Sequence, residues 1–523
     1  MAIKNWKKVL PFNFEMLFIC LAVGFPYTAI ANNDIAIYPA VKTAEASQLF
    51  KAEVKGHPIF VEKFKDIHYL RFGHTNKVVI SIAIAEPVKE WDISGLDSIK
   101  KKSLKGNILT VQLEKPGYHV VTINKVHRLF ILTDPITAVP LLQQPEVVSI
   151  MKYDADSTGV NLSTEAIQKA LDETAIQKKI LYFPPGIYKT GTITVKSNSR
   201  VYLAAGALLL GSEHREHYPS DPGWKESDHV NDKKNFTING ESMTFSRLIL
   251  IDNASNVRIW GSGSIDGSGS IIRAQGKPAN LIRIRNSNNI EIEGLALRDP
   301  ACWNLHILYA EKVVIRNIKI LNDRTVANTD GFDPDASRDV LIDHCFAYCG
   351  DDNVAIKTTN NGGLLRGCEN ITISNSIFLT KKSAMKIGTE TKAPFIRNIT
   401  FKNNVVLEAD RGMVLYCYDG ALFENIHFIN NYFKDAYPDN ERKAIHFKIS
   451  NRGGKGQIKN VDIINCKIAS TFHSRSQITG LDATSQIDGI KIRHLQIDGK
   501  VCSSAGEMGL RTNEFVKNIT FEN

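Results

Sequence analysis

Two short segments of the chain concentrate the side chains that could do chemistry. Residues 328–335 read Asn-Thr-Asp-Gly-Phe-Asp-Pro-Asp, and residues 350–357 read Gly-Asp-Asp-Asn-Val-Ala-Ile-Lys. Asp330 and Asp351 are 21 residues apart, which is about one short coil of a repetitive β-structure. Residues in adjacent coils of such a structure stack about 4.8 Å from each other. We therefore expect Asp330, Asp351 and Asp352 to form a cluster of three carboxylates.

Three close carboxylates cannot all ionise at low cost, because like charges raise the pKa of at least one of them. The result is a protonated acid beside ionised bases, which hydrolysis of a glycosidic bond requires. For Asp351 and Asp352 to face one site the backbone must bend, and Gly350 permits such a bend. From the residues alone two other interpretations stay open, namely turns built by Asp and Asn and a calcium site.

Both segments lie within a long series of sequence repeats. Each unit has a polar pair followed by an apolar-x-apolar pattern, and many units end in Asn. The first apolar residues of successive units are between 23 residues (Ile290 to Val313) and 35 residues (Ile426 to Val461) apart. Such a period with one strand in each unit predicts a solenoid with its apolar side chains inside. The paired leucines and helical segments of leucine-rich repeats are missing from these units, so we expect a right-handed parallel β-helix over residues 146–523.

Two further features support this fold. The Asn at the end of many units can stack on its counterparts as a ladder inside a turn. A helix over residues 163–174, with Ser163 as its N-cap and an apolar face at Ile167 and Leu171, would cover the first coil. A solenoid needs such a cap because its end strands are otherwise exposed edges.

The region before the repeats has a different pattern. Over residues 46–136 short alternating segments such as Val78 to Ile84 are separated by Gly and Pro, without a competing helical period. This pattern predicts a small antiparallel β-sandwich domain, and the stretch from Thr137 to Pro145 is a linker. The whole protein is therefore expected to be all-β.

Residues 1–31 resemble a secretory signal peptide. Lys4, Lys7 and Lys8 form a basic start, an apolar or small stretch follows from Leu17 to Phe25, and Ala29-Ile30-Ala31 is a small-x-small cleavage signal. The apolar stretch is too short to span a membrane. We expect a soluble protein that is secreted or periplasmic.

Composition excludes several other classes of protein. The net charge of +9 comes from 64 basic and 55 acidic residues that are scattered along the chain, whereas nucleic-acid binding would need clustered basic residues. Seven cysteines remain after the expected cleavage, without Cys-x-x-Cys spacing, so a zinc site is not expected. We expect a monomer that binds neither nucleic acid nor membrane, and whose partner is a polysaccharide or oligosaccharide substrate.

The two acidic segments together resemble the motifs of glycoside hydrolase family 28, the polygalacturonase family. The resemblance covers residues 150–430 and extends to several upstream motifs, namely Tyr153-x-Ala155-Asp156-Ser157-Thr158-Gly159, Phe183-Pro184-Pro185-Gly186-x-Tyr188, Gly206-Ala207-x-Leu209-x-Gly211-Ser212 and Gly261-x-Gly263-x-Ile265-Asp266-Gly267-x-Gly269. The β-domain before the helix is also similar to that of the dextranase and isopullulanase family.

The resemblance implies an inverting hydrolase without a metal or another cofactor. Asp351 matches the general acid that protonates the leaving oxygen. Asp330 and Asp352 match the carboxylates that activate water, and Asp333 supports them.

Two departures from the family pattern affect the expected substrate. Ser383 stands where the family has His, and Val414 and Tyr416 replace the Arg and Lys that hold the uronate carboxylate of pectin. A bidentate carboxylate site cannot be made from Val. Other cations could compensate for this loss. The expected substrate-binding residues are therefore Asn328, Lys357, Lys382, Lys386, Arg411 and Tyr416.

The residues and motifs are compatible with other functions. If no cation compensates, the substrate could be a neutral α-glycan, as for a dextranase. A polysaccharide lyase or epimerase would share the solenoid, and so would a non-catalytic glycan-binding β-helix. Tyr416 and Tyr418 could stack on sugar rings or belong to the core.

Overall fold

The computed structural model describes residues 31–32, 34–97, 99–220, 237–238, 241–242, 245–359, 364–438, 441–473 and 476–522. The predicted signal peptide, apart from Ala31, lies outside these residues. None of the helices in the described part of the chain is both long and apolar enough to span a membrane.

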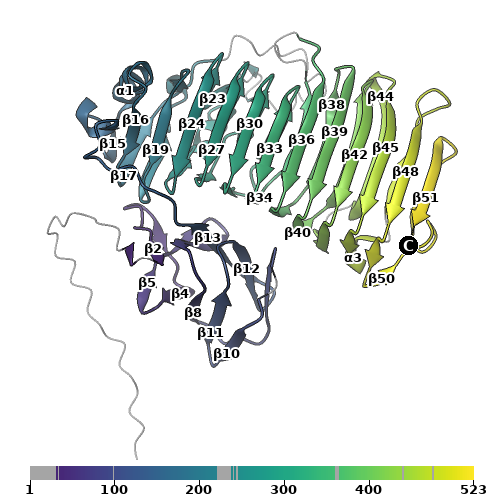
Figure 1. Cartoon of the computed structure of the whole chain (residues 1–523), viewed down its shortest axis with the longest axis horizontal. Coiled ribbons are helices and arrows are strands. Elements are labelled where there is room, and N and C mark those ends of the chain that lie inside the picture. Colours follow the sequence, from purple (N-terminus) through teal and green to yellow (C-terminus); the bar gives the residue numbers. More distant parts are fainter. Residues whose placement is uncertain are drawn as a thin grey trace, which may run out of the picture.

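The main body is a parallel β-helix, as predicted. Its three long sheets run along the same axis (Figure 1). Sheet I has 13 strands in the described residues, and all of its strand pairs are parallel. These strands are β14 (Val147–Ser149), β16 (Ile180–Phe183), β19 (Arg200–Leu203), β24 (Ser255–Gly261), β27 (Asn288–Glu293), β30 (Glu311–Arg316), β33 (Arg338–Asp343), β36 (Cys368–Ser374), β39 (Phe395–Lys402), β42 (Leu422–Ile429), β45 (Gln457–Ile464), β48 (Ile487–Arg493) and β51 (Val516–Glu522).

Sheet II follows sheet I in each coil and is also parallel, except for its last pair. It contains β15 (Thr158–Leu162), β17 (Gly186–Thr190), β20 (Ala207–Gly211), β25 (Ser264–Asp266), β28 (Ala296–Arg298), β31 (Lys319–Leu321), β34 (Phe346–Cys349), β37 (Ile377–Thr380), β40 (Val405–Ala409), β43 (Tyr432–Ala436), β46 (Lys467–Ile468), β49 (Gln496–Ile497) and β50 (Lys500–Val501).

Sheet III completes the coils and carries both acidic segments. Its strands are β18 (Ile193–Val195), β23 (Ser246–Asp252), β26 (Ala279–Arg285), β29 (Leu305–Leu308), β32 (Phe332–Asp335), β35 (Val354–Thr358), β38 (Ser383–Thr391), β41 (Arg411–Asp419), β44 (Lys443–Gly454) and β47 (Gln477–Thr479).

The sequence repeats correspond to the strands of sheet I. Ile315 pairs with Ile342, and Ile342 pairs in turn with Ile373, so equivalent apolar residues stack coil upon coil. All three are fully buried. The stack forms one continuous core, because neighbouring side chains on a strand point to opposite faces and the apolar set points inward.

The predicted asparagine ladders are present, and they occur both outside and inside the coils. On the surface Asn398 donates to Asn370 at 3.1 Å, and Asn425 donates to Asn398 at 3.2 Å. Inside, the buried Asn404 donates to Asn431 at 3.1 Å. Asn398 has a φ of 55°, a left-handed conformation that Asn tolerates better than most residues. The same residue type therefore makes the bend and links the coils.

Helix α1 (Thr164–Ile176) covers the first coils, as expected for a cap. Its buried residues include Ile167 and Leu171. Ser163 occupies the N-cap position, but its hydroxyl accepts a hydrogen bond from the Asp156 N–H at 2.9 Å instead of one from the helix. The shorter helical elements are η1 (Ile150–Tyr153), η2 (Arg215–His217), α2 (Gly269–Ala274) and α3 (Ser470–His473), and β21 (Thr237–Ile238) pairs with β22 (Glu241–Ser242).

The N-terminal region is a β-sandwich of mostly antiparallel strands. One sheet contains β1 (Ala31–Asn32), β2 (Ile35–Ile37), β3 (Glu45–Ala46), β6 (Val61–Phe64), β7 (Ile67–His74), β9 (Trp91–Gly95), β12 (Tyr118–Ile123) and β13 (His127–Pro135). The other contains β4 (Phe50–Val54), β5 (His57–Ile59), β8 (Val78–Ile84), β10 (Lys102–Lys105) and β11 (Ile108–Leu113). The domain begins earlier than the predicted residue 46, since β1 and β2 belong to it. Strands of two or three residues show no detectable alternation in the sequence.

The sandwich packs against sheet II of the β-helix (Figure 1). Phe130 of β13 contacts Phe346 and Tyr348 of β34, with ring centroids 4.9 and 5.3 Å apart. The buried ammonium of Lys319 on β31 pairs with Asp134 on β13. The two parts therefore share a core and a buried ion pair.

Candidate active site

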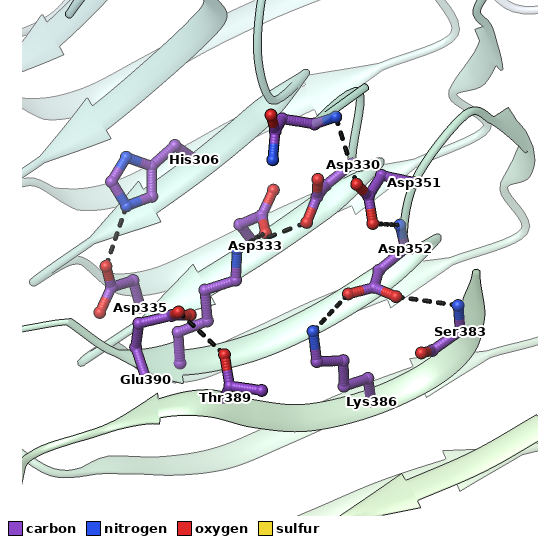
Figure 2. A network of polar contacts seen from close by, with 12 residues as sticks. His306, Asp330, Asp333, Asp335, Asp351, Asp352, Ser383, Lys386, Thr389 and Glu390 are labelled. Carbon is purple, nitrogen blue, oxygen red and sulfur yellow. Dashed lines mark hydrogen bonds and ion pairs between the residues drawn. The ribbon is translucent and has the colours of Figure 1, made fainter. Parts of the chain in front are cut away.

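The three predicted catalytic aspartates lie in two stacked turns at the edge of sheet III (Figure 2). Asp330 comes just before β32, and Asp351 and Asp352 come just before β35. Because Phe332 pairs with Val354, the two turns stack on each other. Each aspartate has one carboxylate oxygen within 4.8 Å of an oxygen of the other two. The structure thus brings together all three residues, as the 21-residue spacing predicts.

Close backbone contacts shape the second turn. A Cβ atom at Gly350 would lie 2.6 Å from the Thr329 hydroxyl and 2.6 Å from the Val326 carbonyl oxygen, so glycine is needed for close approach between coils. The Asn328 and Asp352 N–H groups donate to the two oxygens of Asp351 at 3.2 and 3.0 Å. These bonds hold Asp351 at the rim, where it stays partly exposed.

Of the three aspartates, Asp352 has the shortest contacts with neighbouring side-chain and backbone donors. Its Oδ2 lies 2.6 Å from the Lys386 ammonium, and its Oδ1 accepts the Ser383 N–H at 2.8 Å (Figure 2). Asp352 as a whole residue is 2% exposed. Burial alone would raise the pKa of Asp352, but Lys386 and Arg411 outweigh this effect and lower it. Asp352 is therefore ionised.

The other two aspartates have raised pKa values. Burial raises the pKa of Asp351, and the charge of Asp352 adds to the effect. Burial also raises the pKa of Asp330, against the opposing charge of Lys357, whose Nζ lies 3.4 Å from Asp330 Oδ2. The site thus combines one carboxyl group with a lowered pKa and two with raised pKa values, and pKa values pushed apart in this way suit acid–base catalysis.

Lys357 lies beneath the cluster instead of on its surface. Its Nζ is 2.9 Å from Asp333 Oδ1 and 3.6 Å from the centroid of the Trp303 ring. Burial raises the pKa of Asp333 to about 6, although Lys357 acts in the opposite direction. The lysine is 3% exposed, and its positive charge offsets the negative charge of the buried carboxyl groups of Asp330 and Asp333.

The remaining predicted substrate-binding residues surround the aspartates. Arg411 pairs in register with Ser383, and its Nε lies 3.5 Å from Asp410 Oδ2. The partly exposed Lys382 donates its N–H to the Thr380 hydroxyl at 3.0 Å. The side chain of Asn328 accepts a hydrogen bond from Arg273 at 3.0 Å.

Tyr416 faces the outer side of sheet III, where it is 6% exposed. Its hydroxyl lies 2.6 Å from Nδ1 of His446, a residue of the next coil. Burial and the nearby Lys443 lower the pKa of His446 to about 4, so the imidazole is neutral at pH 7. Tyr416, which is predicted from the sequence to replace the family's lysine, therefore pairs with a neutral imidazole.

Two residues at this site lie outside the motifs from which the site was predicted. Arg273 holds Asn328 from α2, and His446 binds Tyr416 from β44. Neither stands next to an acidic motif. The repeat register, which places position 446 one coil after position 414, could have pointed to His446.

The three aspartates also have the number and type of ligands that a cation needs. However, the ammonium groups of Lys357 and Lys386 already lie against Asp330 and Asp352. These two positive charges oppose a divalent cation in the same place. The donor set therefore fits acid–base chemistry better than calcium.

Comparison with known proteins agrees with the motifs at this site. The model of glycosyl hydrolases family 28 matches residues 229–508, which include all three aspartates. The chain belongs to this family.

Family 28 relatives include a probable polygalacturonase of Vitis vinifera, which is 29% identical over 222 residues covering 40% of this chain and 44% of that protein. An exo-poly-alpha-D-galacturonosidase of Dickeya chrysanthemi is 25% identical over 318 residues, covering 51% of this chain and 52% of that protein. The chain spans about half the length of these curated relatives.

Solved polygalacturonase structures share the fold. The exopolygalacturonase of Thermotoga maritima aligns with a TM-score of 0.56 and 21% identity over 72% of this chain and 92% of that one. The polygalacturonase of Erwinia carotovora aligns with a TM-score of 0.55 and 18% identity over 74% of this chain and 99% of that one. Similarity of the sandwich to the dextranase family stays a prediction.

Proposed function

We propose that the protein is an exported, inverting glycoside hydrolase that cleaves glycosidic bonds in a plant- or algal-type polysaccharide. The observation that carries the proposal is the meeting of three aspartates at one site, where two adjacent residues have pKa values shifted in opposite directions. Asp351, with its raised pKa, serves as the general acid, and Asp352, with its lowered pKa, serves as the general base.

Asp330 assists Asp352 in holding the attacking water. Two oxygens no more than 4.8 Å apart can both hydrogen-bond one water molecule, since each such bond spans about 2.7–2.8 Å. Asp352 then takes the proton as water attacks, while Asp351 gives its proton to the leaving oxygen. The Ser383 N–H and the Lys386 ammonium orient the base for this step.

The proposal of inversion rests on the family resemblance. Inverting enzymes typically hold their carboxyl groups about 6.5–9.5 Å apart, whereas here oxygens of the three residues come within 4.8 Å. The direct test follows the anomeric proton of the first-formed product by NMR. Appearance of the opposite anomer supports inversion, and appearance of the same anomer contradicts it.

The subsite beside the scissile bond differs from that of a typical polygalacturonase. Val414 is fully buried, and Tyr416 is hydrogen-bonded to a neutral imidazole. Lys386 pairs with Val414 in register, but its charge is bound to Asp352. We therefore propose that this subsite does not hold a carboxylate as an arginine–lysine pair would. Fastest turnover on unsubstituted polygalacturonate would contradict the altered subsite.

The proposed activity is tested by release of reducing ends from polygalacturonate, rhamnogalacturonan and dextran by the protein from residue 32 onward. Asp351→Asn is the matched control, since it keeps the size of the side chain and removes the transferable proton. Activity on one polymer that the variant loses supports the proposal. Products with an unsaturated uronate, or loss of activity with a chelator, would indicate a lyase.

A further inference from the structure

The outer side of sheet III beyond the aspartates is rich in cations, and most of them already have acidic partners. The paired groups are Lys386 with Asp352 at 2.6 Å, Arg411 with Asp410 at 3.5 Å, Lys443 with Glu441 at 2.5 Å, and Arg452 with Asp419 at 2.6 Å. A carboxylate of the substrate would have to compete with a protein carboxylate for each of them.

Lys448 on β44 is different. Its side chain is exposed, and it forms no ion pair with any residue in the described part of the chain. In the sheet register Lys448 pairs with Tyr416, so it stands in the same row, one coil further toward the C-terminus. A lysine is therefore present beside the position where the family motif has one, shifted by about 4.8 Å along the β-helix.

Tyr418 provides a flat surface next to this lysine. Its ring stacks on that of Tyr416 with centroids 5.1 Å apart and an interplanar angle of 18°. The Lys448 Nζ lies 5.9 Å from the Tyr418 centroid, and the Arg452 guanidinium carbon lies 5.8 Å from it. Tyr418 is only partly buried, so part of the ring remains accessible.

An aromatic ring beside an unpaired ammonium suits one class of ligand. The ring can pack against the apolar face of a sugar, and the ammonium can bind a carboxylate on the same sugar. A neutral sugar would leave the charge of Lys448 unused.

We infer that Tyr418 and Lys448 form a subsite for a uronate residue of the substrate, one coil beyond Val414 and Tyr416. The inference rests on the proposed hydrolase function, because it places the sugar beside the scissile bond over Val414 and Tyr416 and the acidic sugar next to it. The substrate class is then an acidic glycan whose carboxylate is recognised one position away from the bond that is cleaved.

The test measures binding in the inactive Asp351→Asn background, so that turnover does not consume the ligand. The probes are trigalacturonate and galactotriose, which differ in their carboxylates. Lys448→Met should weaken binding of trigalacturonate at least about tenfold and leave galactotriose within twofold, because one charge-assisted contact is lost. Tyr418→Ala should weaken binding of both probes. Lys402→Met, an exposed lysine on sheet I, is the control and should change neither.

Two results would overturn the inference. The first is equal binding of trigalacturonate by the Asp351→Asn protein with and without Lys448→Met. The second is an Asp351→Asn protein that binds trigalacturonate no more tightly than galactotriose. Failure of the proposed function is visible separately, because it would appear as reducing-end release that Asp351→Asn does not reduce, whatever the binding data show.

Discussion

The ammonium of Lys386 lies 2.6 Å from Oδ2 of Asp352, and Lys386 pairs in the sheet register with Val414. A lysine one coil before the replaced arginine of the family motif thus contacts the proposed base instead of an open subsite. The charge of Lys386 therefore helps to keep Asp352 ionised, and it is not free to bind a substrate carboxylate next to Val414.

Lys386→Met should move the acidic limb of the pH profile of kcat/KM to higher pH. Asp352 is also faced by Arg411, which lowers its pKa, and by the carboxyl groups of Asp330, Asp333 and Asp351, whose own pKa values the charge of Asp352 raises. Without Lys386, burial is less fully opposed and the pKa of Asp352 rises, so the base becomes protonated at a higher pH. Lys386→Arg keeps the charge and should shift the limb less. An unchanged acidic limb in Lys386→Met would contradict this role.

Asp351→Asn should lower kcat on a natural polysaccharide by at least about 10²-fold, because the leaving oxygen then departs without a proton. Because its pKa is raised, Asp351 stays protonated to a higher pH than an ordinary aspartate. Deprotonation of Asp351 then forms the basic limb of the wild-type pH profile of kcat/KM. An aryl glycoside with an acidic leaving group should lose less activity. Equal loss on both substrates would argue against a general acid.

Gly350→Ala should reduce kcat by tenfold or more with a smaller change in KM. The added Cβ would meet the Val326 carbonyl oxygen at 2.6 Å, so the turn that carries Asp351 must shift. Gly117→Ala is the matched control, since a Cβ there has no atom within 4 Å. If both variants keep wild-type kinetics, the turn tolerates the displacement and the argument for Gly350 is wrong.

Lys319→Met should lower the free energy of unfolding by about 3 kcal/mol, because it leaves the buried Asp134 without its closest cation. The double variant Lys319→Met/Asp134→Asn should recover part of this loss. Denaturant unfolding of the single and double variants measures both values. Additive effects of the two substitutions would show that the pair does not couple the sandwich to the β-helix.

Burial lowers the pKa of Lys319 to about 8, against an unfolded value near 10.5. The unfolded chain therefore binds more protons between these two values, and this group's contribution to stability rises as the pH increases from about 8 to about 10.5. A comparison of wild type with Lys319→Met across this range should show the difference in unfolding free energy changing in that direction. A constant difference would contradict a titrating Lys319.

Local periodicity allowed much of the fold to be predicted from the sequence. The unit around Asn398 and Ile399 repeats often enough to identify strands, their inward faces and their stacking, because one coil of a solenoid depends mainly on its neighbours. The 21-residue spacing of Asp330 and Asp351 predicted their proximity for the same reason. Short strands such as Ile35–Ile37 were missed, since three residues carry no period.

The sequence by itself therefore determined the β-helix and the meeting of Asp330, Asp351 and Asp352, because coil-to-coil register is a local property of the repeats. Only the tertiary structure decided that Lys386 binds Asp352, that Tyr416 binds His446 and that Lys448 has no acidic partner among the residues the structure describes. These outcomes depend on which long side chain reaches which neighbour across two or three coils. A lysine has several rotatable bonds, so its partner depends on burial and on competing charges that no spacing in the sequence records.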